Sequence, residues 1–260
     1  MTTQSAAFLV IGAADVRRLM SMRECIDIVR RTMSCVSRGD AQLPLRIGAA
    51  LPRNTGAIVA MPGYLDEPPS AGAKLLAVLP GNTQRGLSSH MGVVVLFDPE
   101  DGTPFALVEA SSVTALRTAA ATAVATAALA RTNAVDLAIL GAGEQAAAHL
   151  HAIPLVHSVR SIRIWSRSRE KTEQLAARAS DELGIQIQVC SSVEQAVTEA
   201  SIICTTTSAR EPILCGRWLQ PGVHVNLVGA STATAREVDD DLVVNSRFFV
   251  DYRPSALAQA

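Results

Sequence analysis

The sequence predicts an α/β protein of two domains, an α+β domain followed by a domain built on a parallel β-sheet. The chain has 260 residues, of which 48% are hydrophobic, so a sizeable core is available. Before about residue 115, short apolar runs are separated by turn signals. From residue 135 onward, apolar strands alternate with helical segments, which indicates a parallel sheet covered on both faces. We place the domain boundary so that residues 1–116 and 117–260 form the two domains.

The first domain begins with a predicted helix over residues 15–39, where apolar residues recur at helical spacing and Gly39 is a plausible end. Four apolar stretches rich in strand formers follow. The seven residues "DPEDGTP" lie within the last of them and predict a hairpin loop. These stretches cover residues 45–51, 56–65, 71–82 and 91–110. This half is therefore expected to be rich in antiparallel strands.

An alanine-rich helix over residues 112–132 is expected to link the halves. The second domain then alternates in order along the chain. Strands are predicted at 135–140, 161–166, 185–189, 201–207 and 223–230, with helices at 144–156 and 168–183 and a short helix from residue 191. Ser192 with Gln195 fits a capping box at the start of that short helix.

Composition excludes several classes of protein. Formal net charge is -1, which gives no global attraction to nucleic acid or to anionic membranes. We expect no signal peptide and no membrane-spanning segment. The five cysteines lack C-x-x-C spacing, so we expect no disulfide framework and no metal site, and a cytoplasmic location.

The stretch "VDLAILGAGEQAAAHLHAI" predicts a phosphate-binding loop of the Rossmann type. It follows a predicted strand and opens a predicted helix, which is the context that a G-x-G-x-x-G/A match requires. Gly141 would make the tight turn, Gly143 would let the backbone approach a pyrophosphate, and Ala146 would let the helix pack on the strand. The alternative is an ordinary strand–helix turn with two glycines.

The end of the second strand indicates which dinucleotide binds. An NAD site usually has an acidic residue there, about 20 residues on, to bond the ribose 2′-hydroxyl. Here Ser166 stands at that place, followed by Arg167 and Ser168. A hydroxyl beside arginines attracts a 2′-phosphate, so we predict NADP(H), with NAD(H) possible. The alternative is that the arginines are a solvated helix start, although positive charge there opposes the helix dipole.

An ordered series of motifs resembles the ornithine cyclodeaminase/mu-crystallin family over nearly the whole chain. The stretches are "LPLR", "AKLLAVLPGN", "FDPEDGTPFALVEASSVTALRTAA", "ILGAGEQAAAHL", "IWSRS", "TTTSAREPIL" and "PGVHVNLVGAS". The resemblance implies a Rossmann-type domain plus a substrate-binding and dimerisation domain, and a homodimer. Family members are usually some tens of residues longer, so their C-terminal return segment is expected to be absent from this sequence.

The resemblance also implies an oxidoreductase acting on amino or imino acids. Arg46, Lys74 and Arg117 match family substrate positions, and a guanidinium is well suited to hold a planar carboxylate. His90 is a candidate acid or pocket cap, although it could equally be structural. The candidate cofactor-binding residues are Thr118, Gly141, Ala142, Gly143, Glu144, Gln145, Ser166, Arg167, Ser168, Thr206, Thr207, Val228 and Gly229.

The motif "GAS" at residues 229–231 separates two activities within the family. Cyclodeaminases have an aspartate at the third position, and their proton transfers need a general base. Ser231 is a poor base, whereas a protonated cyclic imine is already an electrophile. We therefore expect reduction of a cyclic imino acid, Δ1-pyrroline-2-carboxylate or Δ1-piperideine-2-carboxylate, to proline or pipecolate.

In this hypothesis Arg46 and Arg117 hold the carboxylate, and Lys74 orients it or donates to the imine side. Ser231 and His90 are candidates for hydrogen bonding or proton delivery. The alternatives are an ornithine cyclodeaminase, an alanine- or opine-type dehydrogenase, and a non-catalytic NADPH-dependent binding protein.

Overall fold

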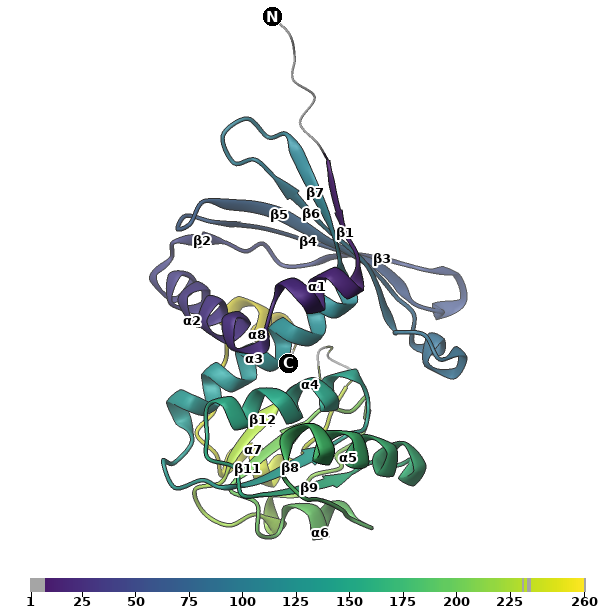
Figure 1. Ribbon diagram of the computed structural model, residues 1–260, viewed down its shortest axis with the longest axis vertical. Helices are drawn as coiled ribbons and strands as arrows, with labels where there is room; N and C mark the ends of the chain where they lie inside the picture. The colour runs from purple at the N-terminus through teal and green to yellow at the C-terminus, as the bar shows by residue number, and fades with distance from the viewer. Residues whose placement is uncertain (1–7, 231, 233–234, 260) are drawn as a thin grey trace, which may run out of the picture. The chain divides into compact units, whose positions relative to one another are not determined.

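The chain divides into two compact units, residues 1–114 and residues 115–260. The computed structural model describes residues 8–230, 232 and 235–259 (Figure 1). The division falls two residues from the boundary expected from the sequence, and it lies inside one continuous helix. The expected roles of the two domains in substrate binding and dimerisation stay predictions.

The described part of the first unit contains seven strands and three helices. The strands are β1 (Leu9–Ile11), β2 (Ala41–Gln42), β3 (Ile47–Ala50), β4 (Ala57–Leu65), β5 (Ser70–Val78), β6 (His90–Phe97) and β7 (Pro104–Glu109). The helices are α1 (Ala13–Leu19), α2 (Met22–Arg38) and the start of α3 (Ala110–Leu129). The sheet order is β1-β7-β6-β5-β4-β2, with β3 also on β4. All strand pairs in this sheet are antiparallel except β1 with β7. The expectation of a first half rich in antiparallel strands is therefore confirmed.

The N-terminal helix predicted over residues 15–39 is wrong in one respect, because the chain forms two helices there. Ser21 is the N-cap of α2: its hydroxyl accepts from the Glu24 N–H, and the Glu24 carboxylate accepts from the Ser21 N–H. This capping box interrupts the helical pattern and starts a new helix. Gly39 ends α2 with φ 88°, a left-handed conformation that favours glycine.

The hairpin predicted at "DPEDGTP" is confirmed between β6 and β7. The Asp98 N–H donates to the Thr103 carbonyl at 2.9 Å, and Gly102 has φ 77°. The hairpin brings β7 back beside β6, and α3 starts directly after β7.

The second unit is a parallel sheet with helices on both faces. Its strands are β8 (Asp136–Leu140), β9 (Ser161–Trp165), β10 (Ile187–Val189), β11 (Ile202–Thr205) and β12 (His224–Leu227). Its further helices are α4 (Glu144–Ala152), α5 (Arg169–Leu183), α6 (Val193–Val197), α7 (Asp240–Val244) and α8 (Arg253–Gln259). The strand order is β10-β9-β8-β11-β12, and every pair is parallel. The predicted fold class, a Rossmann-type parallel sheet plus an α+β unit, is confirmed.

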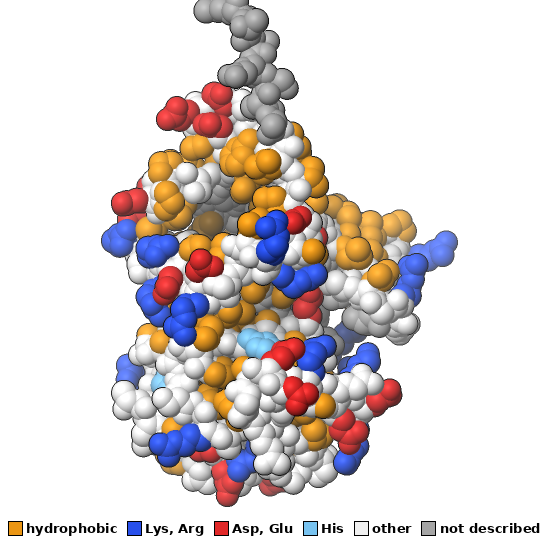
Figure 2. Space-filling model, in the orientation of Figure 1, with side chains coloured by type: hydrophobic (Ala, Val, Ile, Leu, Met, Phe, Trp, Pro, Cys, Tyr) orange, Lys and Arg blue, Asp and Glu red, His pale blue; other side chains and the backbone are white. Residues whose placement is uncertain are grey.

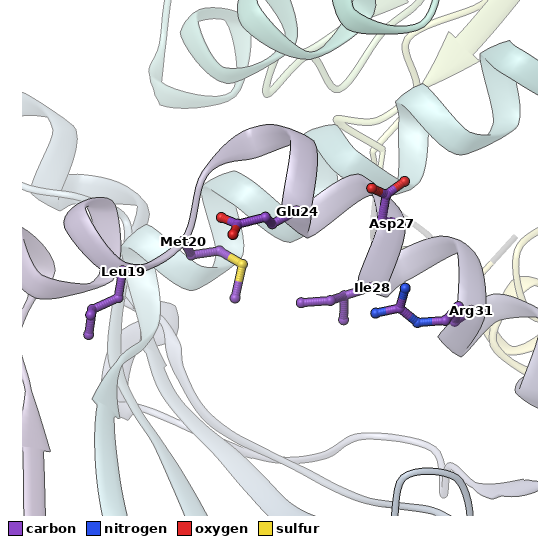
Figure 3. Close-up of a pocket in the computed structure, with 6 residues that line it drawn as sticks. All are labelled: Leu19, Met20, Glu24, Asp27, Ile28 and Arg31. Atoms are coloured by element: carbon purple, nitrogen blue, oxygen red, sulfur yellow. The ribbon is translucent and has the colours of Figure 1, made fainter.

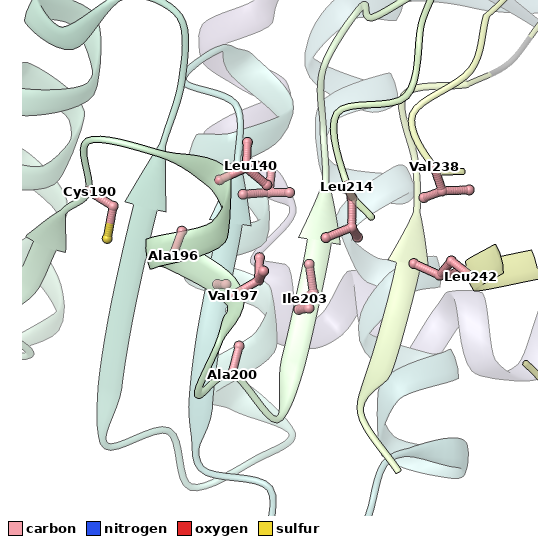
Figure 4. Packing of buried hydrophobic residues seen from close by; sticks show 11 residues of the cluster. Leu140, Cys190, Ala196, Val197, Ala200, Ile203, Leu214, Val238 and Leu242 are labelled. Atoms are coloured by element: carbon pink, nitrogen blue, oxygen red, sulfur yellow. The ribbon is translucent and has the colours of Figure 1, made fainter. Parts of the chain in front are cut away.

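The core of the second unit lies on both faces of this sheet. On one face, Ala138, Leu140 and Ile203 pack with Val197 of α6 and Leu242 of α7 (Figure 4). The opposite face points to α3, where the buried Asn226 side chain donates to the Thr126 hydroxyl at 3.0 Å. Because both faces of the sheet are covered, the polar loops lie at the ends of the strands.

The capping box predicted at α6 is half formed. The Ser192 hydroxyl accepts from the Gln195 N–H at 3.1 Å, as expected. The Gln195 side chain, however, accepts from the Ser191 N–H at 2.8 Å rather than from Ser192. The Gln195 side chain therefore binds the N–H of the residue that precedes the N-cap.

Helix α3 differs from the expectation of no membrane-spanning segment. It has 20 residues and a mean hydropathy of 1.2, so by length and composition alone it could cross a membrane. The core helix of a soluble protein passes the same test. Its alanine content accounts for the value, and Ala119, Ala120 and Ala123 are fully buried.

Candidate active site

The carboxyl ends of the parallel strands meet at one edge of the second sheet. The last residues of four strands lie in register, Trp165 beside Leu140, Leu140 beside Thr205, and Thr205 beside Leu227. The strand order reverses between β8 and β11, and ligands of such sheets bind outside the carboxyl ends at this switch point. All but one of the candidate cofactor residues follow these strand ends; Thr118 lies on α3.

The glycine loop after β8 has the geometry that a dinucleotide loop needs. Gly141 has φ 132°, and a Cβ there would lie 2.5 Å from the Thr206 hydroxyl oxygen. Gly143 is the N-cap of α4, and a Cβ there would meet nothing within 4 Å. Ala146 is fully buried against the sheet. A tight turn, an open approach to the backbone and close helix packing are therefore all present, and the residues fit a pyrophosphate.

Behind this loop, a buried histidine joins α4 to α3. The Nδ1 atom of His149 lies 2.7 Å from the Gln145 carbonyl, and Nε2 lies 2.9 Å from the Thr122 hydroxyl. Burial lowers the pKa of His149 to about 4, although the bond to the Gln145 carbonyl opposes the shift. Because a carbonyl only accepts, the neutral ring carries its proton on Nδ1 and accepts from Thr122. His149 therefore holds the first turn of α4, which follows the glycine loop, against α3.

The loop after β9 uses its hydroxyl groups internally. Ser166 Oγ lies 2.7 Å from the Thr172 hydroxyl and accepts from the Ser168 N–H at 3.2 Å. Ser168 is in turn the N-cap of α5. Arg169 pairs with Glu173 at 2.7 Å, whereas Arg167 is exposed and has no ion pair among the described residues. Among the residues predicted to bind a 2′-phosphate, Arg167 is therefore the one with a positive charge that forms no ion pair within the described residues.

A buried carboxylate that the sequence analysis missed joins the loops after β11 and β12. Glu237 is 1% exposed, and its oxygens accept five hydrogen bonds from the neighbouring loops. The donors are the Thr205 hydroxyl, the Thr207 N–H and hydroxyl, and the N–H groups of Gly229 and Ala230. A Cβ on Gly229 would lie 2.7 Å from Glu237 Oε1, so this glycine is needed for packing. Nothing local in "TAREVDD" marks Glu237, because its partners lie elsewhere in the sequence.

The substrate residues predicted in the first unit share one face of its sheet. Lys74 on β5 is half-buried, with Nζ 3.5 Å from the Thr114 hydroxyl of α3. His90 begins β6 opposite Val78, and Val78 lies four residues along β5 from Lys74, which is about 13 Å. By strand alternation, Lys74, Leu76 and His90 lie on the same face.

The two predicted arginines occupy different places. Arg46 precedes β3, whose Ile47 pairs with Ala60, while Lys74 pairs with the next residue of β4, Met61. Alternation places Arg46 on the same face as Lys74, two strands away. Arg117 is exposed and lies in the second unit, three residues beyond Thr114 on α3. The substrate-binding roles of these residues stay predictions, and Ser231 lies outside the described residues.

A surface depression in the first unit holds none of the predicted site residues. It has a volume of about 290 Å³ and is lined by residues of α1, α2 and the turn between them (Figure 3). Two of its three charged groups, Glu24 and Asp27, already have local partners. Glu24 caps Ser21, and Asp27 pairs with Arg30 at 3.2 Å. It therefore lacks the converging free polar groups of a binding site.

Comparison with known proteins decides the family. The profile of the ornithine cyclodeaminase/mu-crystallin family matches residues 8–259. This chain belongs to the ornithine cyclodeaminase/mu-crystallin family. The predicted resemblance is thus confirmed, and it extends over both units.

Individual relatives of this family member include reductases and dehydrogenases. It is 37% identical to ketimine reductase mu-crystallin of Rattus norvegicus over 85% of this chain and 70% of that protein. The structure of Thermococcus litoralis Δ1-pyrroline-2-carboxylate reductase in complex with NADH and L-proline is similar, with a TM-score of 0.94 and 34% identity over 97% of this chain and 78% of that one. An archaeal alanine dehydrogenase dimer with bound NAD has a TM-score of 0.90 and 28% identity over 96% of this chain and 76% of that one.

Proposed function

We propose that this family member is an NAD(P)H-dependent reductase of cyclic imino acids. Its product from a five-membered ring is proline, and from a six-membered ring it is pipecolate. The observation that carries the proposal is the glycine loop at the switch point, in a chain similar along 97% of its length to a reductase in complex with NADH and L-proline. Similarity to ketimine reductase mu-crystallin supports the same substrate class.

The chemistry asks little of the protein beyond binding and orientation. The reduced nicotinamide supplies a hydride to the imine carbon. The protein has to hold the substrate carboxylate, keep water out and deliver a proton. Arg46 and Arg117 are proposed to bind the carboxylate, and Lys74, on the same sheet face of the first unit as Arg46, to orient it or donate to the imine side. A guanidinium matches a carboxylate in two parallel bonds, so arginine suits this role better than lysine.

Proton delivery is proposed for His90 or Ser231. His90 Nδ1 lies 2.9 Å from the Ser89 hydroxyl, and the His90 N–H is bound by the Ser88 hydroxyl. The Ser89 bond helps to orient the imidazole, which lies on the sheet face that also carries Lys74. A histidine can exchange a proton near neutral pH, which is the property that the step needs.

NADPH is proposed as the preferred cofactor, in contrast to the NADH bound by the Thermococcus litoralis reductase. The support is local and comes from the loop after β9. No acidic residue follows that strand before Glu170, and Arg167 is exposed beside it. An arginine there favours a 2′-phosphate, whereas an acidic residue would favour the ribose hydroxyl.

A homodimer is proposed to form through the open face of the first sheet. Strand alternation places Val10, Ile47, Ile58, Leu75 and Met91 on the face opposite Lys74 and α3. They are large apolar side chains, and Val10 and Ile47 are 76% and 70% exposed. Figure 2 shows hydrophobic side chains gathered at the surface over the strands of this unit. A contiguous apolar face of this kind is typical of a protein interface, and the similar alanine dehydrogenase is a dimer.

A substrate panel tests the proposed function against its alternatives. The expected result is NADPH oxidation at 340 nm with Δ1-pyrroline-2-carboxylate or Δ1-piperideine-2-carboxylate. Ammonia release from ornithine with NAD⁺ would instead make the protein a cyclodeaminase. Turnover only with pyruvate and an amine would make it an alanine- or opine-type dehydrogenase, and cofactor binding with no turnover on the panel would make it a binding protein.

A further inference from the structure

The Glu237 carboxylate is unusual because it is buried without a cation. No ion pair to it is found among the described residues, although it is 1% exposed. Burying a charge is costly unless hydrogen bonds replace the lost water. Here five N–H and O–H groups converge on two oxygens at distances between 2.6 and 3.2 Å. The carboxylate is therefore the centre of a fully satisfied polar cluster, which rigidifies its surroundings.

The cluster adds side-chain hydrogen bonds between two loops that already approach each other where the Val228 and Gly229 N–H groups donate to the Thr205 carbonyl at 3.0 and 3.2 Å. Oε1 accepts from the N–H and hydroxyl of Thr207, in the loop after β11. Oε2 accepts from the N–H groups of Gly229 and Ala230, in the loop after β12. The backbone of Glu237 is itself held, since its carbonyl accepts from the N–H groups of Ile213 and Leu214.

These two loops belong to one half of the dinucleotide site. A doubly wound sheet binds a dinucleotide across the switch point, with one nucleotide on each half. The glycine loop after β8 and the Ser166–Ser168 loop after β9 serve the pyrophosphate and the adenosine ribose. The loops after β11 and β12 lie on the other side of β8 and are left for the nicotinamide half.

We propose that Glu237 is a positioning residue for the nicotinamide half of the cofactor site. It touches neither cofactor nor substrate in this role, and acts by holding the Thr207 and Gly229–Ala230 backbone in place. Ala230 directly precedes Ser231, so the same carboxylate also fixes the start of the segment that carries the predicted proton-transfer residue. The inference rests on the proposed function, because it assumes that a dinucleotide binds at this edge.

The experiment compares a whole cofactor with a fragment that lacks nicotinamide. The variant is Glu237→Gln, which keeps the size of the side chain. In either amide orientation the NH₂ group of glutamine faces a backbone N–H, that of Thr207 or those of Gly229 and Ala230. Two donors cannot bond to each other, so at least one hydrogen bond of the cluster is lost. We expect the Kd for NADPH to rise about tenfold or more, as for loss of one or two buried hydrogen bonds. The Kd for 2′-phospho-ADP-ribose should change by less than about twofold, since the adenosine half does not use Glu237.

The matched control is Asp239→Ala, two residues further along. Asp239 Oδ1 accepts from the N–H groups of Gly216 and Leu242 and caps α7, but it contacts neither cofactor loop. Its loss should lower the melting temperature and leave NADPH affinity unchanged. Amide hydrogen exchange supplies a second readout, with Thr207, Gly229 and Ala230 exchanging faster in Glu237→Gln than in Asp239→Ala.

A variant that perturbs the cluster less covers the case in which Glu237→Gln does not fold. Thr205→Val removes one buried hydroxyl donor at 2.7 Å and keeps the carboxylate. It should show the same difference between NADPH and the fragment, with a smaller rise in Kd.

The outcomes separate the two proposals. Unchanged NADPH affinity in the folded variants would overturn the role of Glu237 and leave the proposed function standing. Equal loss of both ligands, or an equal loss in Asp239→Ala, would also overturn it. If the wild-type protein binds NADH rather than NADPH, the same comparison uses NADH and ADP-ribose. Binding of neither dinucleotide would overturn the proposed function, and this inference with it.

Discussion

Gly141 lies so close to Thr206 that no side chain fits between them. A Cβ on Gly141 would be 2.5 Å from the Thr206 hydroxyl oxygen and 2.8 Å from its carbonyl oxygen. The same Thr206 N–H and hydroxyl donate to the Leu140 carbonyl at 2.8 and 3.0 Å. The glycine loop is thus packed directly against the first residue of the loop after β11, so the two sides of the switch point are in contact.

The two glycines of the loop are predicted to behave differently when replaced by alanine. Gly141→Ala forces a strained backbone conformation and a clash, at a cost of order 1–3 kcal/mol in the free energy of unfolding. Gly143→Ala meets open space and should cost less than about 1 kcal/mol. Its methyl group would lie where the pyrophosphate approaches, so its NADPH affinity should fall. Thermal unfolding without cofactor and titration with NADPH separate the effects, and equal destabilisation by both substitutions would contradict the geometry.

Arg167 is predicted to select the phosphate form of the cofactor. Arg167→Ala should raise the KM for NADPH about tenfold or more and leave the KM for NADH nearly unchanged, because only the former carries a 2′-phosphate. Arg169→Ala is the matched control, since Arg169 already pairs with Glu173. Steady-state kinetics with both cofactors measure the ratio. A wild-type protein that prefers NADH would show this assignment to be wrong.

His149 is predicted to make stability fall on acidification. The unfolded chain binds a proton at the ordinary histidine pKa of 6.5, whereas the buried ring resists protonation down to about pH 4. The unfolded state therefore binds more protons in this window, and stability present above pH 6.5 is lost as the pH falls toward 4. The loss is about 3 kcal/mol. Urea unfolding at several pH values should show this slope in the wild-type protein and a reduced slope in His149→Gln. His151→Gln controls for removal of a partly exposed imidazole, paired with Glu182, from the same helix.

Lys74 is predicted to act in turnover and not in cofactor binding. Lys74→Met should lower kcat/KM for the imino acid about a hundredfold through loss of a carboxylate partner. The Kd for NADPH should stay within about twofold, because the dinucleotide loops belong to the other unit. Thr114→Val removes the 3.5 Å contact to Lys74 and should change kcat/KM by less than about threefold. Comparable losses in both variants would point to a structural role for Lys74.

The parts of the fold with local signals could be predicted from the sequence. Strand–helix alternation gave the parallel sheet, and the glycines at 141 and 143 follow a buried strand, β8, at the expected place. The hairpin at Asp98–Thr103 has turn residues in its own sequence. The break between α1 and α2 also has a local signal, because Ser21 and Glu24 have capping-box spacing. The apolar pattern continues through these residues, however, and favours a single helix.

The parts that depend on distant contacts could not be predicted in this way. Glu237 binds Thr205 and Thr207, which precede it by 32 and 30 residues, so no local pattern marks it. The sequence predicts Ser166 as a phosphate contact, but its hydroxyl lies 2.7 Å from the Thr172 hydroxyl and organises its own loop. Strand β1 pairs with β7, which lies almost a hundred residues later in the chain. The three apolar residues of β1 alone do not predict that pairing.

The most direct test of the central claim is the stoichiometry of one reaction. The purified protein is incubated with Δ1-pyrroline-2-carboxylate and NADPH, and both the oxidised cofactor and the proline formed are measured. The account predicts one proline for each NADPH consumed, with no ammonia released. NADPH that is bound but not consumed, or ammonia released from ornithine with NAD⁺ and no reduction of the imine, would contradict it.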